Sequence, residues 1–202
     1  MESGGQELLG EPMRSRSSPS FFDVTHVLTP DQIRLLLLAA QWAPSCGNAQ
    51  PAGFVVAERG SPSHDVLTRN LSRGNSRWVP RASAVFITAA QFAPDEQGEG
   101  GTKPRYAEYD LGQAAAHLTL QAVTMGLAAH QFAGFDKDAV AAELGVPSYY
   151  RVMSGIAVGV PGSPEDVPPD EQDRLHRARR RRSLEAIAHG DRWGVPWERV
   201  AR

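Results

Sequence analysis

The stretch from about Ala107 to Leu127 constrains the fold most, because it predicts a long helix that is apolar on nearly all sides. One side carries apolar residues at the helical period, and Leu120, Val123 and Leu127 lie on the other side. A helix with this pattern is buried on both flanks. The chain has 202 residues, enough for one domain with tails. We therefore expect one flank to pack in the core and the other to lie against a second subunit.

The rest of the chain alternates between helix and strand patterns. Thr29, Pro30 and Gln32 form a helix start, with an N-cap, a first-turn proline and a side chain that returns to the cap, and this helix should end before Pro44. Further elements are expected as helices at 64–72 and 136–144, and as strands at 54–56, 84–90, 129–133 and 152–159. Periodicity alone favours a parallel α/β sheet as the default, which the long buried helix and the detached C-terminal arm fit poorly.

Composition and charge narrow the class of protein. The 21 basic and 23 acidic residues give a formal net charge of -2, which argues against a general nucleic-acid coat. An alternative is a helical binding module that contacts nucleic acid through the basic run RARRRRS. The longest apolar run, residues 82–90, is too short to span a membrane. The N-terminus lacks a secretory-signal pattern, and Cys46 is the single cysteine. We therefore expect a cytoplasmic protein with neither a membrane nor a nucleic acid as partner.

Residue types that often carry chemistry form few patterns. The motifs CxxC, HExxH, GxSxG and GxxxxGK[ST] are absent, and the six histidines lack metal-ligand spacing, so no metal site is predicted. Polar residues gather in three places, at residues 14–18, 44–51 and 177–182. Arginine guanidinium groups and serine hydroxyls suit a phosphate dianion, although Arg-rich ends can equally be solvated tails.

The second polar cluster and its surroundings resemble the nitroreductase family of FMN-dependent oxidoreductases. That family has a helix, a P-S-S-x-N-x-Q-P loop and an F-x-V strand, and this chain has A-P-S-C-G-N-A-Q-P followed by F-V-V. Further matches are R-S-S-P-S-F-F-D near the N-terminus, G-N before Trp78, D-L-G-Q-A-A in the long helix, G-F-D with L-G-V-P after it, and R-R-S-L-E near the C-terminus. The resemblance covers about residues 13–197 in the family's order.

The resemblance implies an α+β fold with a central, mostly antiparallel sheet flanked by helices, and a C-terminal arm exchanged in a homodimer. It implies a flexible arm over residues 1–12 and one FMN-binding domain over residues 13–202. The resemblance implies that the FMN phosphate is bound by Arg16, Ser17, Ser18, Arg179 and Arg181. It implies that the flavin and its ribityl chain are lined by Pro44, Ser45, Cys46 and Asn48. It also implies that Asn75 bonds the pyrimidine edge, and that the backbone at Ala133 and Gly134 approaches flavin N5. Ser20 stands where the family usually has Arg or Lys.

The implied activity is reduction of nitroaromatics, quinones or similar small acceptors by NADH or NADPH, through ping-pong hydride transfer on FMN. The flavin carries this chemistry, so no catalytic acid or base is predicted. The alternative within the fold is a specialised flavoprotein that stores flavin or performs a biosynthetic oxidase or dehydrogenase step. Ala52-Gly53 replaces the family's usual Trp after Q-P, which predicts a wider pocket unless Trp78 or Phe92 fills the space.

Overall fold

The computed structural model describes residues 6–95, 103–163, 165, 167, 172 and 179–197. The chain divides into two compact units, one of residues 11–167 and one that combines residues 1–10 with 168–202. In the smaller unit the described parts include two short 3-10 segments, Gln6–Leu8 and Leu184–Ala186, and a bridge between His189 and Pro196. Parts of the predicted 94–103 loop and of the RARRRRS run lie outside the described residues.

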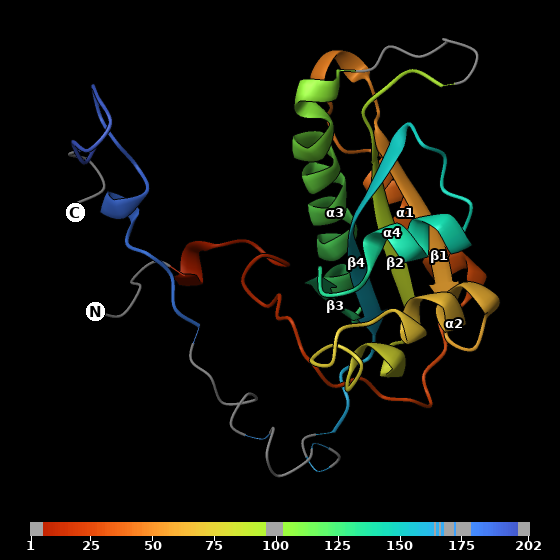
Figure 1. The fold of residues 1–202 in the computed structure, drawn as a ribbon. Coiled ribbons are helices and arrows are strands. Elements are labelled where there is room, and N and C mark those ends of the chain that lie inside the picture. The colour runs from red at the N-terminus through yellow and green to blue at the C-terminus, as the bar shows by residue number, and fades with distance from the viewer. Residues whose placement is uncertain are drawn as a thin grey trace. The chain divides into compact units, whose positions relative to one another are not determined.

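The larger unit is built on a four-stranded sheet in the order β1-β2-β4-β3 (Figure 1). The strands are β1 (Ala52–Glu58), β2 (Ala84–Gln91), β3 (Ala128–Phe132) and β4 (Tyr150–Gly159). All three pairings are antiparallel, so the parallel default was wrong and the antiparallel sheet implied by the resemblance is confirmed. Glu58 at the end of β1 pairs with Ala84 at the start of β2, so the chain re-enters the sheet at the end where it left. Such a return makes neighbouring strands antiparallel.

Helices cover both faces of this sheet. The longer elements are α1 (Pro30–Gln41), α2 (Pro62–Arg69), α3 (Ala107–Thr124) and α4 (Lys137–Glu143). Phe86 packs in the apolar cluster with α1 and α3, whereas its neighbours Val85 and Ile87 pack in the cluster with α2 and α4. This alternation follows from the two-residue period of a strand and makes the unit three layers thick. Short 3-10 segments join these elements at Cys46–Asn48, Val79–Arg81 and Pro104–Tyr106.

The predicted start of the first helix is confirmed. Thr29 Oγ1 accepts a hydrogen bond from the Gln32 backbone N at 3.2 Å, and Gln32 Oε1 accepts one from the Thr29 N at 2.8 Å. Pro30 occupies the first helical position, where its missing N–H costs no hydrogen bond. The helix ends at Gln41, before Pro44, as expected.

One flank of α3 is uncovered within this unit. Leu111, Leu118 and Ala122 are buried against the core, but Tyr109 is 69% exposed on the opposite side. The neighbouring helix α1 leaves Trp42 80% exposed, and a shallow cavity of about 580 Å³ runs between the two helices here. Burial of this other flank by a second subunit therefore stays a prediction. In the described part of the chain, no helix combines the length and the apolar character that crossing a membrane requires.

The close contact between β3 and β4 makes Gly155 a sensitive position. A Cβ at Gly155 would lie 2.5 Å from Cζ of Phe132, and the Phe132 ring also packs against Trp78. Gly155→Ala should lower the free energy of unfolding by about 1–3 kcal/mol, the usual penalty of overpacking. Chemical denaturation would measure this loss, and Gly155→Ala combined with Phe132→Leu should cost less than the sum of the two single changes. Strict additivity would contradict the predicted clash.

Candidate functional site

The N-terminal polar cluster places a guanidinium group beside a hydroxyl. Arg16 Nη1 donates to Ser18 Oγ at 3.0 Å, and the side chains of Ser17 and Ser18 are exposed. The carbonyl of Pro19 lies 3.0 Å from Nδ1 of His130 on β3, which holds this segment against the sheet. Ser20 follows as a half-buried residue. Charged N–H and O–H donors side by side suit an anionic oxygen.

A second pair of predicted residues meets where β3 ends. Asn75 Nδ2 donates to the Gly134 carbonyl at 3.1 Å, and the backbone N of Ser72 donates to the same carbonyl at 2.9 Å. A Cβ at Gly134 would lie 2.7 Å from both Asn75 Nδ2 and Ser72 Oγ, so the site accepts only glycine without rearrangement. The neighbouring Ala133 is exposed, and its carbonyl accepts a hydrogen bond from Lys137 Nζ at 3.1 Å. The fold thus joins two segments that lie far apart in the sequence.

Trp78 and His130, neither of which was expected to contact the cofactor, connect these groups. Trp78 Nε1 donates to Asn75 Oδ1 at 3.2 Å, and the Trp78 ring stacks on His130 with centroids 4.3 Å apart. Trp78 belongs to the apolar cluster of α2 and α4, whereas Ala52 packs with the clusters on the α1 and α3 side, so Trp78 does not fill the space beside Ala52. The sequence feature that could have indicated the inward position of His130 is its place in the strand. Because side chains alternate between the two faces of a strand, His130 lies on the same face as the apolar Ala128 and Phe132.

The environment of His130 favours its neutral form. Burial lowers the pKa of His130, and the nearby Arg16 guanidinium acts in the same direction, although the hydrogen bond to Pro19 opposes them. A carbonyl oxygen can only accept, so this contact requires the proton on Nδ1.

The loop between α1 and β1 is held by a buried carboxylate. Asp110, in the first turn of α3, is 3% exposed, and its Oδ2 accepts a hydrogen bond from the Cys46 backbone N at 2.9 Å. Left-handed φ angles occur at Gly47, Asn48 and Gln50, at 60°, 56° and 49°. Ser45 Oγ accepts from the Gln50 backbone N at 3.0 Å, while Pro44 and Asn48 are exposed. Such backbone angles persist where surrounding contacts hold them, and Asp110 provides one. Asp110 begins the D-L-G-Q-A-A motif, but the motif alone does not indicate the role of this carboxylate.

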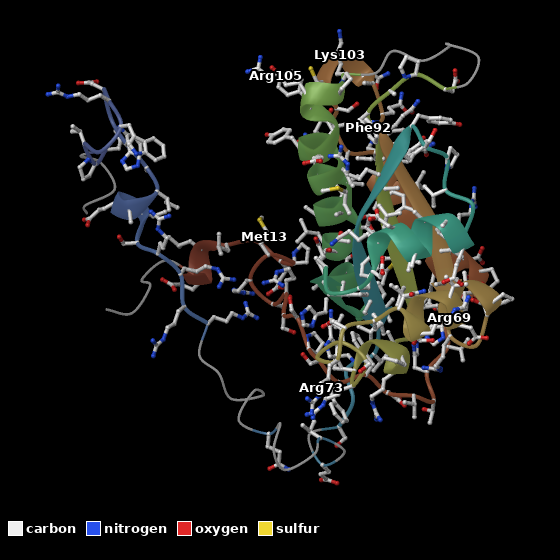
Figure 2. The ribbon with its side chains drawn as sticks, viewed as in Figure 1. Met13, Arg69, Arg73, Phe92, Lys103 and Arg105 are labelled. Carbon is white, nitrogen blue, oxygen red and sulfur yellow. The ribbon has the colours of Figure 1, made fainter. Side chains whose placement is uncertain are left out.

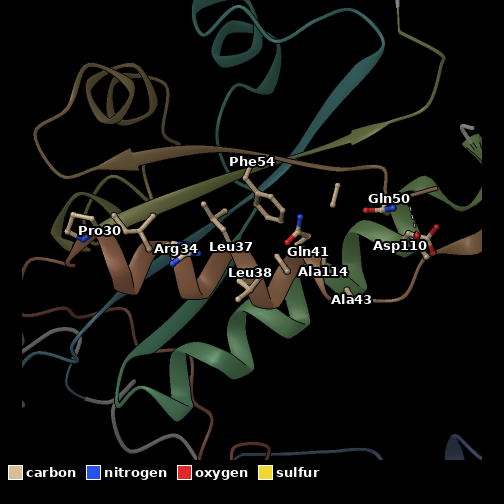
Figure 3. Close-up of a pocket in the computed structure, with 14 residues that line it drawn as sticks. Pro30, Arg34, Leu37, Leu38, Gln41, Ala43, Gln50, Phe54, Asp110 and Ala114 are labelled. Carbon is tan, nitrogen blue, oxygen red and sulfur yellow. Dashed lines mark hydrogen bonds between the residues drawn. The ribbon is translucent and has the colours of Figure 1, made fainter. Parts of the chain in front are cut away.

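This loop borders a cavity of about 660 Å³ between α1, α3 and the start of β1 (Figure 3). Phe54 and Ala114 contribute apolar walls, while Gln50 and Asp110 lie at one end and Arg34 at the other. Ala52 also lines the cavity, so the position of the family's usual Trp adjoins open space. Phe92 packs in the same small apolar cluster as Ala52 and Phe54. The cavity can therefore accept a flat apolar group with polar atoms at its edge.

The predicted contacts fall into two sets at opposite ends of the larger unit. A Cβ on Gly47 would lie 3.4 Å from Lys103 Cε, and Figure 2 shows Lys103 at one end of the unit and Arg73, which precedes Asn75 in its loop, at the other. The set at residues 44–48 and the set around Asn75 and Gly134 therefore do not converge within one chain. The remaining two predicted contacts, Arg179 and Arg181, belong to the smaller unit and are exposed.

Comparisons with known proteins agree with this fold. A family model described as the nitroreductase family matches residues 13–65 and 58–160. The chain is similar to an uncharacterized 15.4 kDa protein in the ask 5′ region of Mycolicibacterium smegmatis, with 36% identity over 151 residues that cover 71% of this chain and 98% of that protein. It is also similar to the 5,6-dimethylbenzimidazole synthase of Rhodospirillum rubrum, with 27% identity over 182 residues that cover 76% and 83% of the two chains.

Solved structures show the same similarity. An oxidoreductase containing FMN has 29% identity and a TM-score of 0.80, with 89% of this chain and 90% of that chain covered. A nitroreductase family protein from Clostridium novyi has 21% identity and a TM-score of 0.63, with 98% of both chains covered, and supports the fold. Because the family model matches most of its length and the α+β architecture is shared, this chain belongs to the nitroreductase family of oxidoreductases.

Proposed function

We propose that this protein is an FMN-dependent enzyme that uses NADH or NADPH to reduce nitroaromatics, quinones or similar small acceptors by ping-pong hydride transfer. The observation that carries the proposal is the connected group formed by the Arg16–Ser18 segment, His130, Trp78, Asn75 and Gly134. This group offers charged donors at one side and a closely approached glycine backbone at the other. A similar solved protein is an oxidoreductase containing FMN, and another is a putative NAD(P)H:FMN oxidoreductase from Staphylococcus epidermidis.

The residues present fit an FMN molecule. Arg16, Ser17 and Ser18 would hold the phosphate, because guanidinium and hydroxyl groups bind phosphate oxygens through charge-assisted hydrogen bonds. Asn75 would bond the pyrimidine edge, and the backbone at Ala133 and Gly134 would approach flavin N5. Glycine is required at position 134 because Asn75 and Ser72 occupy the place of a Cβ. Arg179 and Arg181 from the C-terminal arm would join the phosphate. Ser20 would contribute less charge than the usual Arg or Lys.

In this proposal, bound FMN would supply the redox chemistry, and the chain would supply binding, orientation and electrostatics. Asp110 holds the Cys46 backbone, and so fixes the loop of Pro44, Ser45, Cys46 and Asn48 that would line the flavin. The small side chain of Ala52, which lines the cavity, would leave room for the acceptor. No side chain is assigned as a catalytic acid or base.

The two-ended arrangement supports a homodimer. Because the loop at residues 44–48 and the Asn75–Gly134 group lie at opposite ends of the unit, one flavin can contact both only when they come from different subunits. The uncovered flank of α1 and α3 offers an apolar surface for this partner, with Leu35, Leu38 and Trp42 exposed. We place this dimer, with its C-terminal arms exchanged, in the cytoplasm.

A second candidate function is a specialised biosynthetic oxidase or dehydrogenase step. Similarity to a 5,6-dimethylbenzimidazole synthase favours it. One experiment distinguishes the two candidate functions. The purified, flavin-loaded protein is mixed anaerobically with NADPH, and nitroaromatics and quinones are then added. Repeated turnover of these acceptors supports the reductase, whereas flavin reduction without acceptor turnover supports the specialised role.

The phosphate assignment predicts that two arginines distant in sequence act on one ligand. Arg16→Ala and Arg181→Ala should each weaken FMN binding by about 1.5–3 kcal/mol, the usual contribution of a charged hydrogen bond. Titration of the apoprotein with FMN would measure this loss. Arg69→Ala is the matched control, because Arg69 pairs with Glu143 on the exposed surface. Unchanged FMN affinity in both test variants would contradict the assignment.

The dimer proposal predicts that a charge on the uncovered flank separates the subunits. Leu38→Glu should shift the protein from dimer to monomer and release FMN, because a carboxylate in an apolar interface loses its hydration. Light scattering and flavin absorption would follow both changes. Val27→Glu, at an exposed apolar residue outside α1 and α3, should leave both unchanged. A monomer that keeps FMN would refute the shared site.

The open space at position 52 predicts an effect on acceptor size. A Trp side chain buries on the order of 200 Å², so Ala52→Trp should fill much of the space beside Phe54. The KM for bulky quinones should rise more than the KM for small nitroaromatics, with FMN affinity nearly constant. Ala142→Trp, on the exposed side of α4, serves as the control. An equal effect on all acceptors would show that residue 52 lies away from the substrate path.

A further inference from the structure

His130 occupies a place that neither its strand nor the core requires of a histidine. It lies on β3 between the buried Ala128 and Phe132, on the strand face that contributes to the apolar cluster of α2 and α4. The polar edge of its ring contacts the Pro19 carbonyl, 111 residues earlier in the chain. An apolar residue would pack in the same place, so the hydrogen bond is the property that distinguishes histidine here.

The position of the ring is fixed from two directions. Its face stacks on Trp78 with centroids 4.3 Å apart and planes inclined by 19°. Trp78 is itself 4% exposed and held by Asn75 Oδ1 and by an edge contact with Phe132. The Nδ1 atom of His130 therefore has little freedom to follow the Pro19 carbonyl if that carbonyl moves.

The Pro19 carbonyl is well placed to transmit this restraint. Proline has a fixed φ angle, so a held carbonyl at Pro19 also restricts the direction of Ser18 directly before it. Ser18 Oγ in turn accepts a hydrogen bond from Arg16 Nη1 at 3.0 Å. Beyond Pro19 the chain is held again at Phe21, whose carbonyl accepts from the Gly162 backbone N at 3.1 Å. His130 thus acts at the end of the segment that carries the charged donors.

We infer that His130 is a positioning residue: through the Pro19 carbonyl it sets the place of the Arg16–Ser18 segment relative to the Asn75–Gly134 group, and so gives the site its preference for a phosphorylated flavin. This inference rests on the proposed function. It assigns His130 no contact with the flavin, and its effect is confined to the part of the ligand that bears the phosphate.

Comparison of FMN with riboflavin tests this role, because riboflavin lacks the phosphate. In the full-length protein, His130→Phe keeps a stacking ring but removes the Nδ1 donor. It should lower the ratio of FMN affinity to riboflavin affinity by about three- to tenfold, the range of a lost hydrogen bond, with riboflavin affinity nearly unchanged. His130→Asn should retain the ratio, because an Asn amide nitrogen can reach the place of Nδ1. Flavin fluorescence titration gives both affinities.

A second pair of variants covers the case in which the Phe variant does not fold. His130→Gln keeps an amide group but places its nitrogen nearer to the position of Nε2 than to that of Nδ1. The ratio of FMN affinity to riboflavin affinity should therefore fall in His130→Gln and be retained in His130→Asn. Equal losses of FMN and riboflavin binding in the Phe or Gln variants would overturn the inference and indicate a packing role. A wild-type protein that binds neither flavin would instead overturn the proposed function, and this inference with it.

Discussion

Burial of both faces of the antiparallel sheet is the constraint on which the rest of the larger unit depends. β2 and β4 occupy the middle of the sheet, and their alternating side chains need an apolar layer on each side. The pair α1 and α3 supplies one layer, and α2 with α4 supplies the other. The segments that carry polar residues are thereby left at the ends of strands and helices, where connecting backbone can face a ligand.

Two partly buried polar contacts then fix these connecting segments. Asp110 holds the loop before β1, and His130 holds the segment before Phe21. Each side chain comes from a regular element whose position the core already determines, so a local conformation is tied to the global packing. Buried polar groups are expected to be paired in this way, because an unpaired group in the interior costs about 1–3 kcal/mol.

The arrangement of the predicted contacts is also the basis on which we propose a site shared by two chains. The predicted contacts divide between the two ends of the unit. Leu35, Leu38 and Trp42 are exposed apolar residues on the flank of α1 and α3. In the proposed dimer, a second subunit covers this flank, and the loop of one chain shares a flavin with the Asn75–Gly134 group of the other. Family membership accounts for the fold, and the division of the contacts is the property of this chain that supports a shared site.

The sequence by itself determined the elements and the family. Local signals such as the Thr29 cap act over a few residues, and collinear motifs identified the fold without any knowledge of contacts. Periodicity did not give the strand directions, although the family resemblance implied the antiparallel sheet that the structure has. Only the tertiary structure decided that Trp78 lies away from Ala52, and that His130 and Asp110 hold segments 111 and 64 residues away. The physical reason is range: periodicity and capping are properties of neighbouring residues, whereas strand direction and buried hydrogen bonds depend on which distant segments the core brings together.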